Sequence, residues 1–264
     1  MKIAVFGAGT MGSGIAQVFA GKGHTVLLYA SSTASAQRHK DKLAASLNKR
    51  VAKGKMAQEA ADDLMSRVLV EEFEAAADAD LVIECVAENM AVKKELLGRL
   101  DALCKDEAIF ASNTSSLSIT EMGQGLKHHL IGMHFFNPVP AMKLVEVIAG
   151  GNTPAELVDY IKNLSTEIGK TPVVVNEAPG FVVNKILIPN LPARTIFRIN
   201  TFARYLLSWV SLNSTSMMFS TTSQPMRSPR CRGPMGRLQP SCIAISISSA
   251  EATPSCRTQT PSLQ

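Results

Sequence analysis

The chain has 264 residues, of which 46% are hydrophobic, and its formal net charge is +5. A chain of this length can bury the cores of one or two globular domains. Its apolar runs are far shorter than the about 18 residues that a membrane span requires, and none has the pattern of a secretory signal. We therefore expect a cytoplasmic protein without a membrane partner.

The N-terminal segment has the pattern of a strand, a glycine-rich turn, a helix and a second strand. Apolar runs at 1–6 and 25–29 flank a helical pattern that ends at Gly21. In this context G-x-G-x-x-G predicts a dinucleotide site, because the glycines permit a tight turn and close approach of a pyrophosphate to the helix N-terminus. The candidate cofactor-binding residues here are Gly7, Ala8, Gly9, Thr10, Met11 and Gly12.

Ala30 stands at the end of the second strand, where NAD-binding units of this type carry an acid for the ribose 2′-hydroxyl. Hydroxyl residues at 31–33 and cationic residues at 38–40 follow it. These groups suit the 2′-phosphate of NADP, but a solvated turn and a basic helix face have the same pattern. The sequence therefore leaves NAD and NADP as alternatives.

Strand-like runs and helical patterns alternate as far as residue 175. Strands are expected at 68–70, 81–85, 108–110, 130–133, 144–148 and 172–175, and helices at 38–51, 57–65, 91–103 and 155–168. This alternation predicts an α/β fold, a doubly wound Rossmann-type sheet with ligands beyond the carboxyl ends of its strands. Cys85 and Cys104 lack metal-ligand spacing, so we expect ordinary thiols and no metal.

His134 follows an apolar strand and precedes the proline-rich turn at 135–140, after which the apolar segment 142–148 returns with one acid, Glu146. A carboxylate among apolar residues is costly to bury unless it is paired. A histidine partner makes the pair a candidate base, because the carboxylate fixes the imidazole tautomer and stabilises the imidazolium. Taken by itself, a histidine at the end of a strand is more often a structural residue than a catalytic one.

Six ordered motifs lie in residues 1–189, namely GAGTMG at 7–12, VAEN at 86–89, SNTSSL at 112–117, HFFNPVP at 134–140, KLVE at 143–146 and PGFVVN at 179–184. With these motifs the chain resembles the 3-hydroxyacyl-CoA dehydrogenase family, and specifically the bacterial 3-hydroxybutyryl-CoA dehydrogenases. At position 30 this chain has alanine, whereas the NAD-dependent members of the family usually have an acidic residue.

The resemblance implies oxidation of a short (S)-3-hydroxyacyl-CoA to the 3-ketone, with hydride transfer to the nicotinamide. His134 is then the general base, Glu146 orients it, and Ser115 and Asn184 serve the substrate oxygen and the thioester carbonyl. The implied contacts to the nicotinamide half of the cofactor are Glu88, Lys93, Ser115 and Asn137. The implied contacts to CoA include Ser46 and Lys53, on and after a helix that starts near Thr33.

The composition changes near residue 190. Residues 191–264 hold eight arginines, no lysine and one acid, so they contribute +7 and the rest of the chain −2. We do not interpret this segment as nucleic-acid binding. We expect residues 1–184 to form the dinucleotide-binding domain and 185–190 to begin the family's helical second domain. We expect residues 191–264 to form an aberrant, disordered tail in place of that domain.

An inverted DNA segment is our hypothesis for the tail. For this comparison the residues are taken in reverse order, and each residue indicates the first two bases of a codon on the opposite strand. Decoded in this way, three segments resemble the missing domain in the correct order, namely 192–205, 228–236 and 240–254. A real inversion and an assembly error are equally compatible with this pattern. Without that domain we expect weak dinucleotide binding, aggregation and little activity, and the family's homodimer becomes doubtful.

Two other functions remain open. A catalytically inactive dinucleotide-binding or structural member of the same fold is the main alternative, because the second domain is lost. A dehydrogenase of the sugar or 6-phosphogluconate type shares the glycine turn, but its substrate motifs are absent. Oxidoreductase activity with NAD or NADP in butyrate or fatty-acid metabolism is the expected function.

Overall fold

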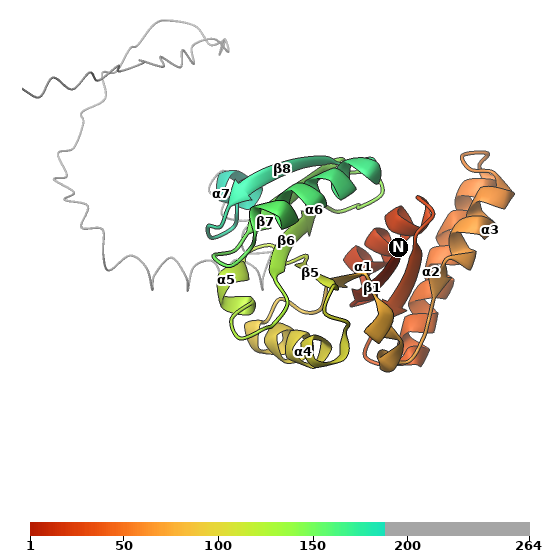
Figure 1. Ribbon diagram of the computed structural model, residues 1–264. Coiled ribbons are helices and arrows are strands. Elements are labelled where there is room, and N and C mark those ends of the chain that lie inside the picture. Colours follow the sequence, from red (N-terminus) through yellow and green to blue (C-terminus); the bar gives the residue numbers. More distant parts are fainter. Residues whose placement is uncertain (188–264) are drawn as a thin grey trace, which may run out of the picture. The chain divides into compact units, whose positions relative to one another are not determined.

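A computed structural model of the chain describes residues 1–187, which contain one eight-stranded sheet flanked by helices (Figure 1). The strand order is β3-β2-β1-β4-β5-β6-β7-β8. The strands are β1 (Lys2–Phe6), β2 (Thr25–Tyr29), β3 (Val68–Leu69), β4 (Leu81–Glu84), β5 (Ile109–Ser112), β6 (Leu130–Phe135), β7 (Leu144–Ala149) and β8 (Thr171–Asn176).

Helices cover both faces of this sheet. Helices α1 and α6 pack on one face, whereas α4, α5 and the 3₁₀ helix η1 pack on the other. The helices are α1 (Thr10–Ala20), α2 (Thr33–Ala52), α3 (Gln58–Ser66), η1 (Phe73–Asp78), α4 (Met90–Leu103), α5 (Ile119–Met122), α6 (Ala155–Glu167) and α7 (Val183–Leu187). The predicted doubly wound Rossmann-type fold is confirmed.

The strand order fixes where a ligand can bind. Strands β1 to β6 are parallel, and the order reverses between β1 and β4, so the crevice beyond their carboxyl ends is the topological switch point. Strand β7 is antiparallel to β6, because the turn after β6 reverses the chain without a crossover helix. The predicted return of the apolar segment after His134 is this β6–β7 pair.

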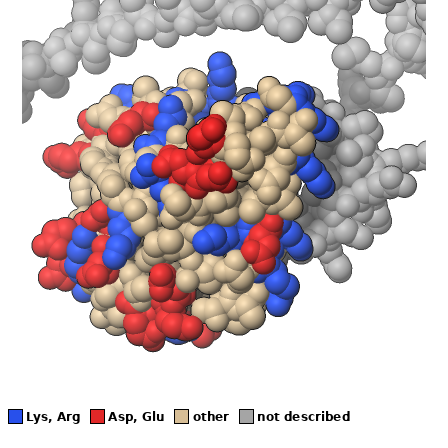
Figure 2. Space-filling model, turned by 90° about the vertical axis from the view of Figure 1, so that its right-hand side faces the viewer, with Lys and Arg blue, Asp and Glu red and all other residues tan. Residues whose placement is uncertain are grey.

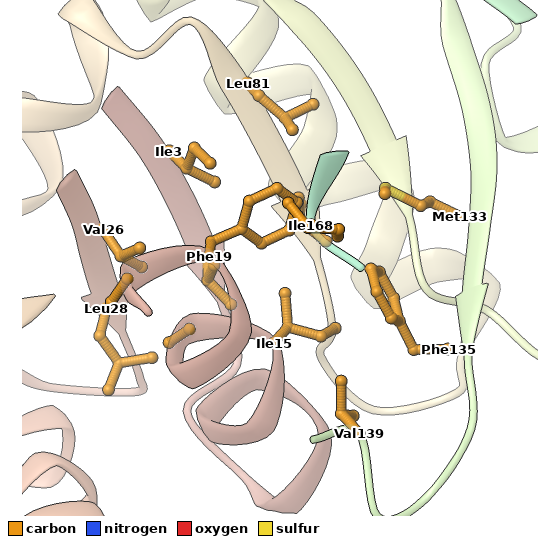
Figure 3. Packing of buried hydrophobic residues seen from close by; sticks show 14 of the residues in the cluster. Ile3, Ile15, Phe19, Val26, Leu28, Leu81, Met133, Phe135, Val139 and Ile168 are labelled. Carbon is orange, nitrogen blue, oxygen red and sulfur yellow. The ribbon is translucent and has the colours of Figure 1, made fainter. Parts of the chain in front are cut away.

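Apolar side chains from distant parts of the chain meet between the sheet and α1. Figure 3 shows Phe19 of α1 with Ile3 and Val26 of the first two strands on one side and Met133 and Phe135 of β6 on the other. Burial of one such aromatic ring stabilises the fold by roughly 1.5–3 kcal/mol relative to an exposed ring. This packing holds the carboxyl ends of β1 and β6, on which the site depends, in one rigid frame.

The sequence did not predict η1 and α5. They span only six and four residues, and one or two turns are too short to show a helical period. Residues 185–187 lie in the last turn of α7, whereas the predicted tail at 191–264 lies outside the described residues.

Charged side chains of both signs are interleaved on the surface drawn in Figure 2, and no single basic field dominates it. Within residues 1–187 no helix is long and apolar enough to cross a bilayer.

Candidate functional site

The glycine-rich turn joins β1 to α1 and approaches the end of β4. A Cβ atom on Gly7 would lie 2.4 Å from the carbonyl oxygen of Cys85, and one on Gly12 would lie 2.0 Å from the carbonyl oxygen of Gly7. Gly7 also has a φ of 109°, which favours glycine. A Cβ atom on Gly9 would meet nothing within 4 Å. Gly7 and Gly12 are therefore required by packing, whereas Gly9 leaves open space before the helix.

This open space suits an anion. Gly9 is the N-cap residue of α1, and no side chain caps the helix there. The N–H groups of the first helical turn and the helix dipole therefore face the space that the absent Cβ atom leaves.

Three cavities adjoin this turn. The first, which we call the glycine-loop cavity, has a volume of about 720 Å³ and lies beyond the ends of β1, β2 and β4. Gly7, Ala8, Gly9 and Ala30, four of the residues predicted to bind the cofactor, line it, and Gly9 also lines a neighbouring cavity. Gly12 lines none of the three, in keeping with its packing role.

The polar groups of the glycine-loop cavity differ from the sequence expectation. Of Arg38, His39 and Lys40, only His39 lines it, and three charged residues that the sequence did not suggest, Glu71, Glu72 and Arg99, line it as well. The hydroxyl of Tyr29 is buried and has no hydrogen-bond partner within the described residues. Burial and nearby Glu71 raise the pKa of this phenol, so it remains a neutral hydrogen-bonding group.

His134 and Glu146 form a cross-strand pair. They are register partners on β6 and β7, and Nδ1 of His134 lies 2.8 Å from Oε2 of Glu146. Their exposed fractions are 6% and 1%. The structure thus brings together the imidazole and the carboxylate that the sequence pattern suggested as a pair.

The second carboxylate oxygen of Glu146 binds the backbone. Oε1 accepts hydrogen bonds from the amides of Val182 and Val183, at 3.0 and 2.9 Å, where α7 begins. Burial alone would raise the pKa of Glu146, but the bonds from His134, Val183 and Val182 outweigh burial and hold this pKa below its ordinary value. The carboxylate is therefore ionised beside the imidazole. No sequence pattern indicated this link to α7.

Aromatic rings enclose the imidazole. The ring centroids of Phe136 and Phe181 lie 4.5 and 5.7 Å from that of His134. Phe181 is buried and has a φ of 50°, which is uncommon for a residue with a side chain. Such strain is consistent with a turn that the surrounding contacts hold in one conformation.

The second cavity, which we call the histidine cavity, has a volume of about 330 Å³ and is lined by seven of the sixteen predicted site residues. Its lining includes His134, Ser115, Asn184, Glu88, Lys93, Asn137 and Met11. Residues that are up to 173 positions apart thus meet in one cavity beyond the ends of β4, β5 and β6.

Within this cavity the polar groups bind one another. Oε1 of Glu88 accepts hydrogen bonds from the Thr114 hydroxyl at 2.6 Å and from the amide and hydroxyl of Ser115 at 2.8 and 3.1 Å. Nδ2 of Asn184 donates to the Ser115 carbonyl at 3.1 Å. Burial would raise the pKa of Glu88, but Lys93 and these donors hold it below its ordinary value.

Lys93 is buried, although its helical position also fitted a solvated residue. Its ammonium lies 2.7 and 2.8 Å from the two carboxylate oxygens of Glu84 and 3.3 Å from Oε2 of Glu88. Burial holds the pKa of Glu84 above its ordinary value, although Lys93 and the bonds from Ser112 and Val86 act to lower it. The sequence analysis missed Glu84, although an acid within the apolar run at 81–85 is the same signal as Glu146.

The third cavity, which we call the proline-turn cavity, has a volume of about 440 Å³ and lies between α1, α2 and the turn after β6. Ser46, Asn137, Thr10 and Lys42 line it. Lys53 is exposed, follows α2 and does not line this cavity. Seven helical positions separate it from Ser46, about 10 Å along the axis. The structure therefore brings Ser46, but not Lys53, to the site, and it adds Lys42.

Comparison with known proteins gives concordant matches. The profile of the family described as 3-hydroxyacyl-CoA dehydrogenase, NAD binding domain, matches residues 2–178. A 3-hydroxybutyryl-CoA dehydrogenase of Clostridioides difficile is 48% identical over 192 residues, which cover 72% of this chain and 68% of the relative. A 3-hydroxyadipyl-CoA dehydrogenase of Escherichia coli is 44% identical, with coverage of 71% and 40%.

Solved structures agree with these matches. The crystal structure of an (S)-3-hydroxybutyryl-CoA dehydrogenase from Ralstonia eutropha aligns with a TM-score of 0.68 and 38% identity, and the alignment covers 71% of this chain and 68% of that one. The chain thus spans about two thirds of the length of two of these relatives and less than half of the third.

Proposed function

The chain belongs to the 3-hydroxyacyl-CoA dehydrogenase family through the NAD-binding domain of that family, and from this membership we propose that it oxidises (S)-3-hydroxybutyryl-CoA, or a similarly short 3-hydroxyacyl-CoA, to the 3-ketoacyl-CoA. The relatives named for this substrate support the proposal, as does the collection of His134, Ser115 and Asn184 in one cavity. The product from the C4 substrate is acetoacetyl-CoA.

The residues of the glycine turn fit a dinucleotide. The space beside Gly9 and the N–H groups of the first turn of α1 accommodate a pyrophosphate, and Tyr29, whose hydroxyl has no hydrogen-bond partner among residues 1–187, lines the adjoining cavity. When bound, NAD supplies a nicotinamide that accepts hydride from the substrate C3. Glu88, Lys93, Ser115 and Asn137 lie in the histidine cavity, where we place the nicotinamide half.

The pairing of His134 with Glu146 determines which imidazole nitrogen acts as the base. Nδ1 of His134 faces the ionised Glu146, so this nitrogen carries the proton and Nε2 presents its lone pair. Nε2 takes the proton of the substrate 3-hydroxyl as the hydride leaves C3 and the ketone forms. Glu146 stabilises the resulting imidazolium. The pairing of Glu146 with His134, which lines the histidine cavity, is the single observation that carries this proposal.

The proposed substrate contacts fall into two sets: neutral groups at the reacting end of the substrate and a separate surface for its CoA portion. We propose that Ser115 and Asn184 hydrogen-bond the substrate oxygen and the thioester carbonyl, and a positioned donor of this kind contributes roughly 3 kcal/mol in the transition state. Ser46 and Lys42 in the proline-turn cavity are proposed to contact the CoA portion, with Lys53 at the outer end of the same surface.

Oxidation of (S)-3-hydroxybutyryl-CoA by NAD, followed by the absorbance of NADH, tests the activity. Turnover of this thioester but not of free 3-hydroxybutyrate or 6-phosphogluconate is expected. NADH binding without turnover of any of the three would instead favour the inactive dinucleotide-binding member. Oxidation of 6-phosphogluconate would contradict the proposal outright.

The domain organisation remains a proposal. Residues 1–184 are proposed as the dinucleotide-binding domain, with 185–190 as the start of the helical domain and 191–264 as the inverted segment. The reported matches cover 71–72% of the chain, which supports a change of sequence character after the first domain. Translation of the reverse complement of codons 191–264 should give a continuous helical-domain sequence, and its absence would refute the inversion.

Substitution of Gly9 by alanine is expected to weaken NADH binding by about tenfold or more without loss of stability, because its Cβ atom enters only the space proposed for the pyrophosphate. The matched Gly12→Ala change should destabilise the fold by about 1–3 kcal/mol, because its Cβ atom would overlap the Gly7 carbonyl. Calorimetric titration and thermal melting separate the two effects. Equal binding by Gly9→Ala and the parent chain would contradict the assignment.

NADH is expected to bind more tightly than NADPH. Ala30 supplies no carboxylate for the ribose, but Glu71 and Glu72 line the same cavity and would repel a 2′-phosphate, and Arg99, which also lines it, lies over the ring of Phe73. Ala30→Asp should therefore increase the preference for NADH further, by about tenfold, through an added ribose contact. Fluorescence titration with both cofactors measures the ratio, and a parent chain that prefers NADPH would refute the prediction.

A further inference from the structure

A buried ion pair lies behind the wall of the histidine cavity. Glu84, the last residue of β4, is fully buried, and Lys93, near the start of α4, is 1% exposed. Glu84 is not among the residues that line the cavity, whereas Lys93 is. Burial of two charges costs several kcal/mol per ion before their attraction is counted, so stability alone is a weak reason for such a pair.

Both oxygens of Glu84 are fully used. Oε1 accepts from the Lys93 ammonium at 2.7 Å and from the Val86 amide at 2.6 Å. Oε2 accepts from the same ammonium at 2.8 Å and from the Ser112 hydroxyl at 2.6 Å. The carboxylate therefore ties the ends of β4 and β5 to α4 and leaves the ammonium little freedom to move.

Lys93 connects Glu84 to groups that line the histidine cavity. Its Nζ atom lies 3.3 Å from Oε2 of Glu88 and 3.3 Å from the carbonyl oxygen of Val86, and both of these residues line the cavity. The other oxygen of Glu88 is held by Thr114 and Ser115. The position of the Glu88 carboxylate thus depends on Lys93, and that of Lys93 on Glu84.

We propose that Glu84 is a positioning residue for the nicotinamide half of the cofactor: it anchors Lys93, which holds Glu88 and the Val86 carbonyl beside His134. This rests on the proposed function, because it assumes that the nicotinamide occupies the histidine cavity. Glu84 itself touches neither cofactor nor substrate. Its effect is expected to be specific to one end of the dinucleotide, because Lys93 and Glu88 line the histidine cavity but not the glycine-loop cavity.

The test compares two ligands on the full chain. NADH has a nicotinamide, whereas ADP-ribose retains the adenosine, the pyrophosphate and the second ribose but lacks that ring. In Glu84→Gln the Kd for NADH is expected to rise about tenfold, whereas the Kd for ADP-ribose should change by less than about twofold. Ser112→Ala, which removes one neutral donor from the same carboxylate and leaves the ion pair, should have the smaller effect.

A double variant separates positioning from folding. Glu84→Gln leaves the buried Lys93 ammonium without its nearest carboxylate, so the melting temperature of this variant should fall. Glu84→Gln with Lys93→Met removes that ammonium and should recover the melting temperature but not NADH affinity.

The contrary outcomes differ from one another. Unchanged NADH binding in Glu84→Gln, parallel weakening of both ligands, or recovery of NADH affinity in the double variant would each overturn the positioning role. If the parent chain binds ADP-ribose but not NADH, the nicotinamide assignment fails and Glu84 has nothing to position. If it binds neither ligand, the dinucleotide function itself fails.

Discussion

His134→Gln is expected to lower turnover of (S)-3-hydroxybutyryl-CoA by about 10³-fold, because general base catalysis contributes factors of this size. The amide of glutamine has no basic nitrogen to take the proton of the 3-hydroxyl. NADH affinity should change little, since the glycine turn and Glu88 are untouched. Steady-state kinetics with saturating NAD and calorimetric titration of NADH measure the two quantities.

His128 offers a matched control for this substitution. It is also a buried histidine whose Nδ1 lies 2.7 Å from a carboxylate, that of Asp101, and its ring stacks on Phe110. It does not line the histidine cavity. His128→Gln should lower the melting temperature while turnover per folded molecule stays near that of the parent chain. Equal losses of turnover in the two variants would show that His134 acts only through the fold.

The pairing of His134 with Glu146 was predictable because two local signals agreed. An acid interrupted an apolar strand, and the proline-rich turn before it made a return beside the preceding strand plausible. The register of an antiparallel pair then places partners on one face. The glycine turn was predictable for a similar reason, since its spacing and its strand–helix context lie within one contiguous segment.

The sequence could not show which distant groups would satisfy these residues. Lys93 had the pattern of a solvated helix residue. Its burial beside Glu84 was not visible from the sequence, because Glu84 belongs to a different element. The amides of Val182 and Val183 donate to Glu146 from the end of a turn, where no helical or strand periodicity could indicate the contact. Glu71 and Glu72 reach the glycine-loop cavity through the packing of β3 beside β2. Each of these contacts depends on tertiary placement, which local patterns do not encode.

Glu146→Gln is expected to lower turnover by about 10³-fold, although the shape of the side chain is nearly unchanged. Glutamine can keep the Val182 and Val183 bonds through its carbonyl oxygen and then donates to Nδ1 of His134 through its amide. This reverses the tautomer, places the imidazole proton on Nε2 and removes the base. Kinetics should show the loss in kcat, with NADH affinity retained.

Glu177→Gln is the matched control, because Glu177 also accepts bonds from hydroxyl and amide groups, those of Ser118 and Thr120, and its pKa is also lowered once these bonds outweigh burial. It does not line the histidine cavity. Loss of stability with retained turnover is expected for this variant. A comparable fall in kcat there would mean that loss of any such carboxylate disturbs the site.

The pH dependence of stability gives Glu146 a second signature. Its pKa in the folded chain lies below the unfolded value of about 4.3, so the ionised carboxylate stabilises the fold above that pH and loses this contribution as the pH falls through the folded pKa. Glutamine does not titrate. The free energy of unfolding of the parent chain should therefore exceed that of Glu146→Gln most at neutral pH, and the difference should shrink below about pH 4. A difference that stays constant with pH would show that the carboxylate is not held in its charged form by His134 and α7.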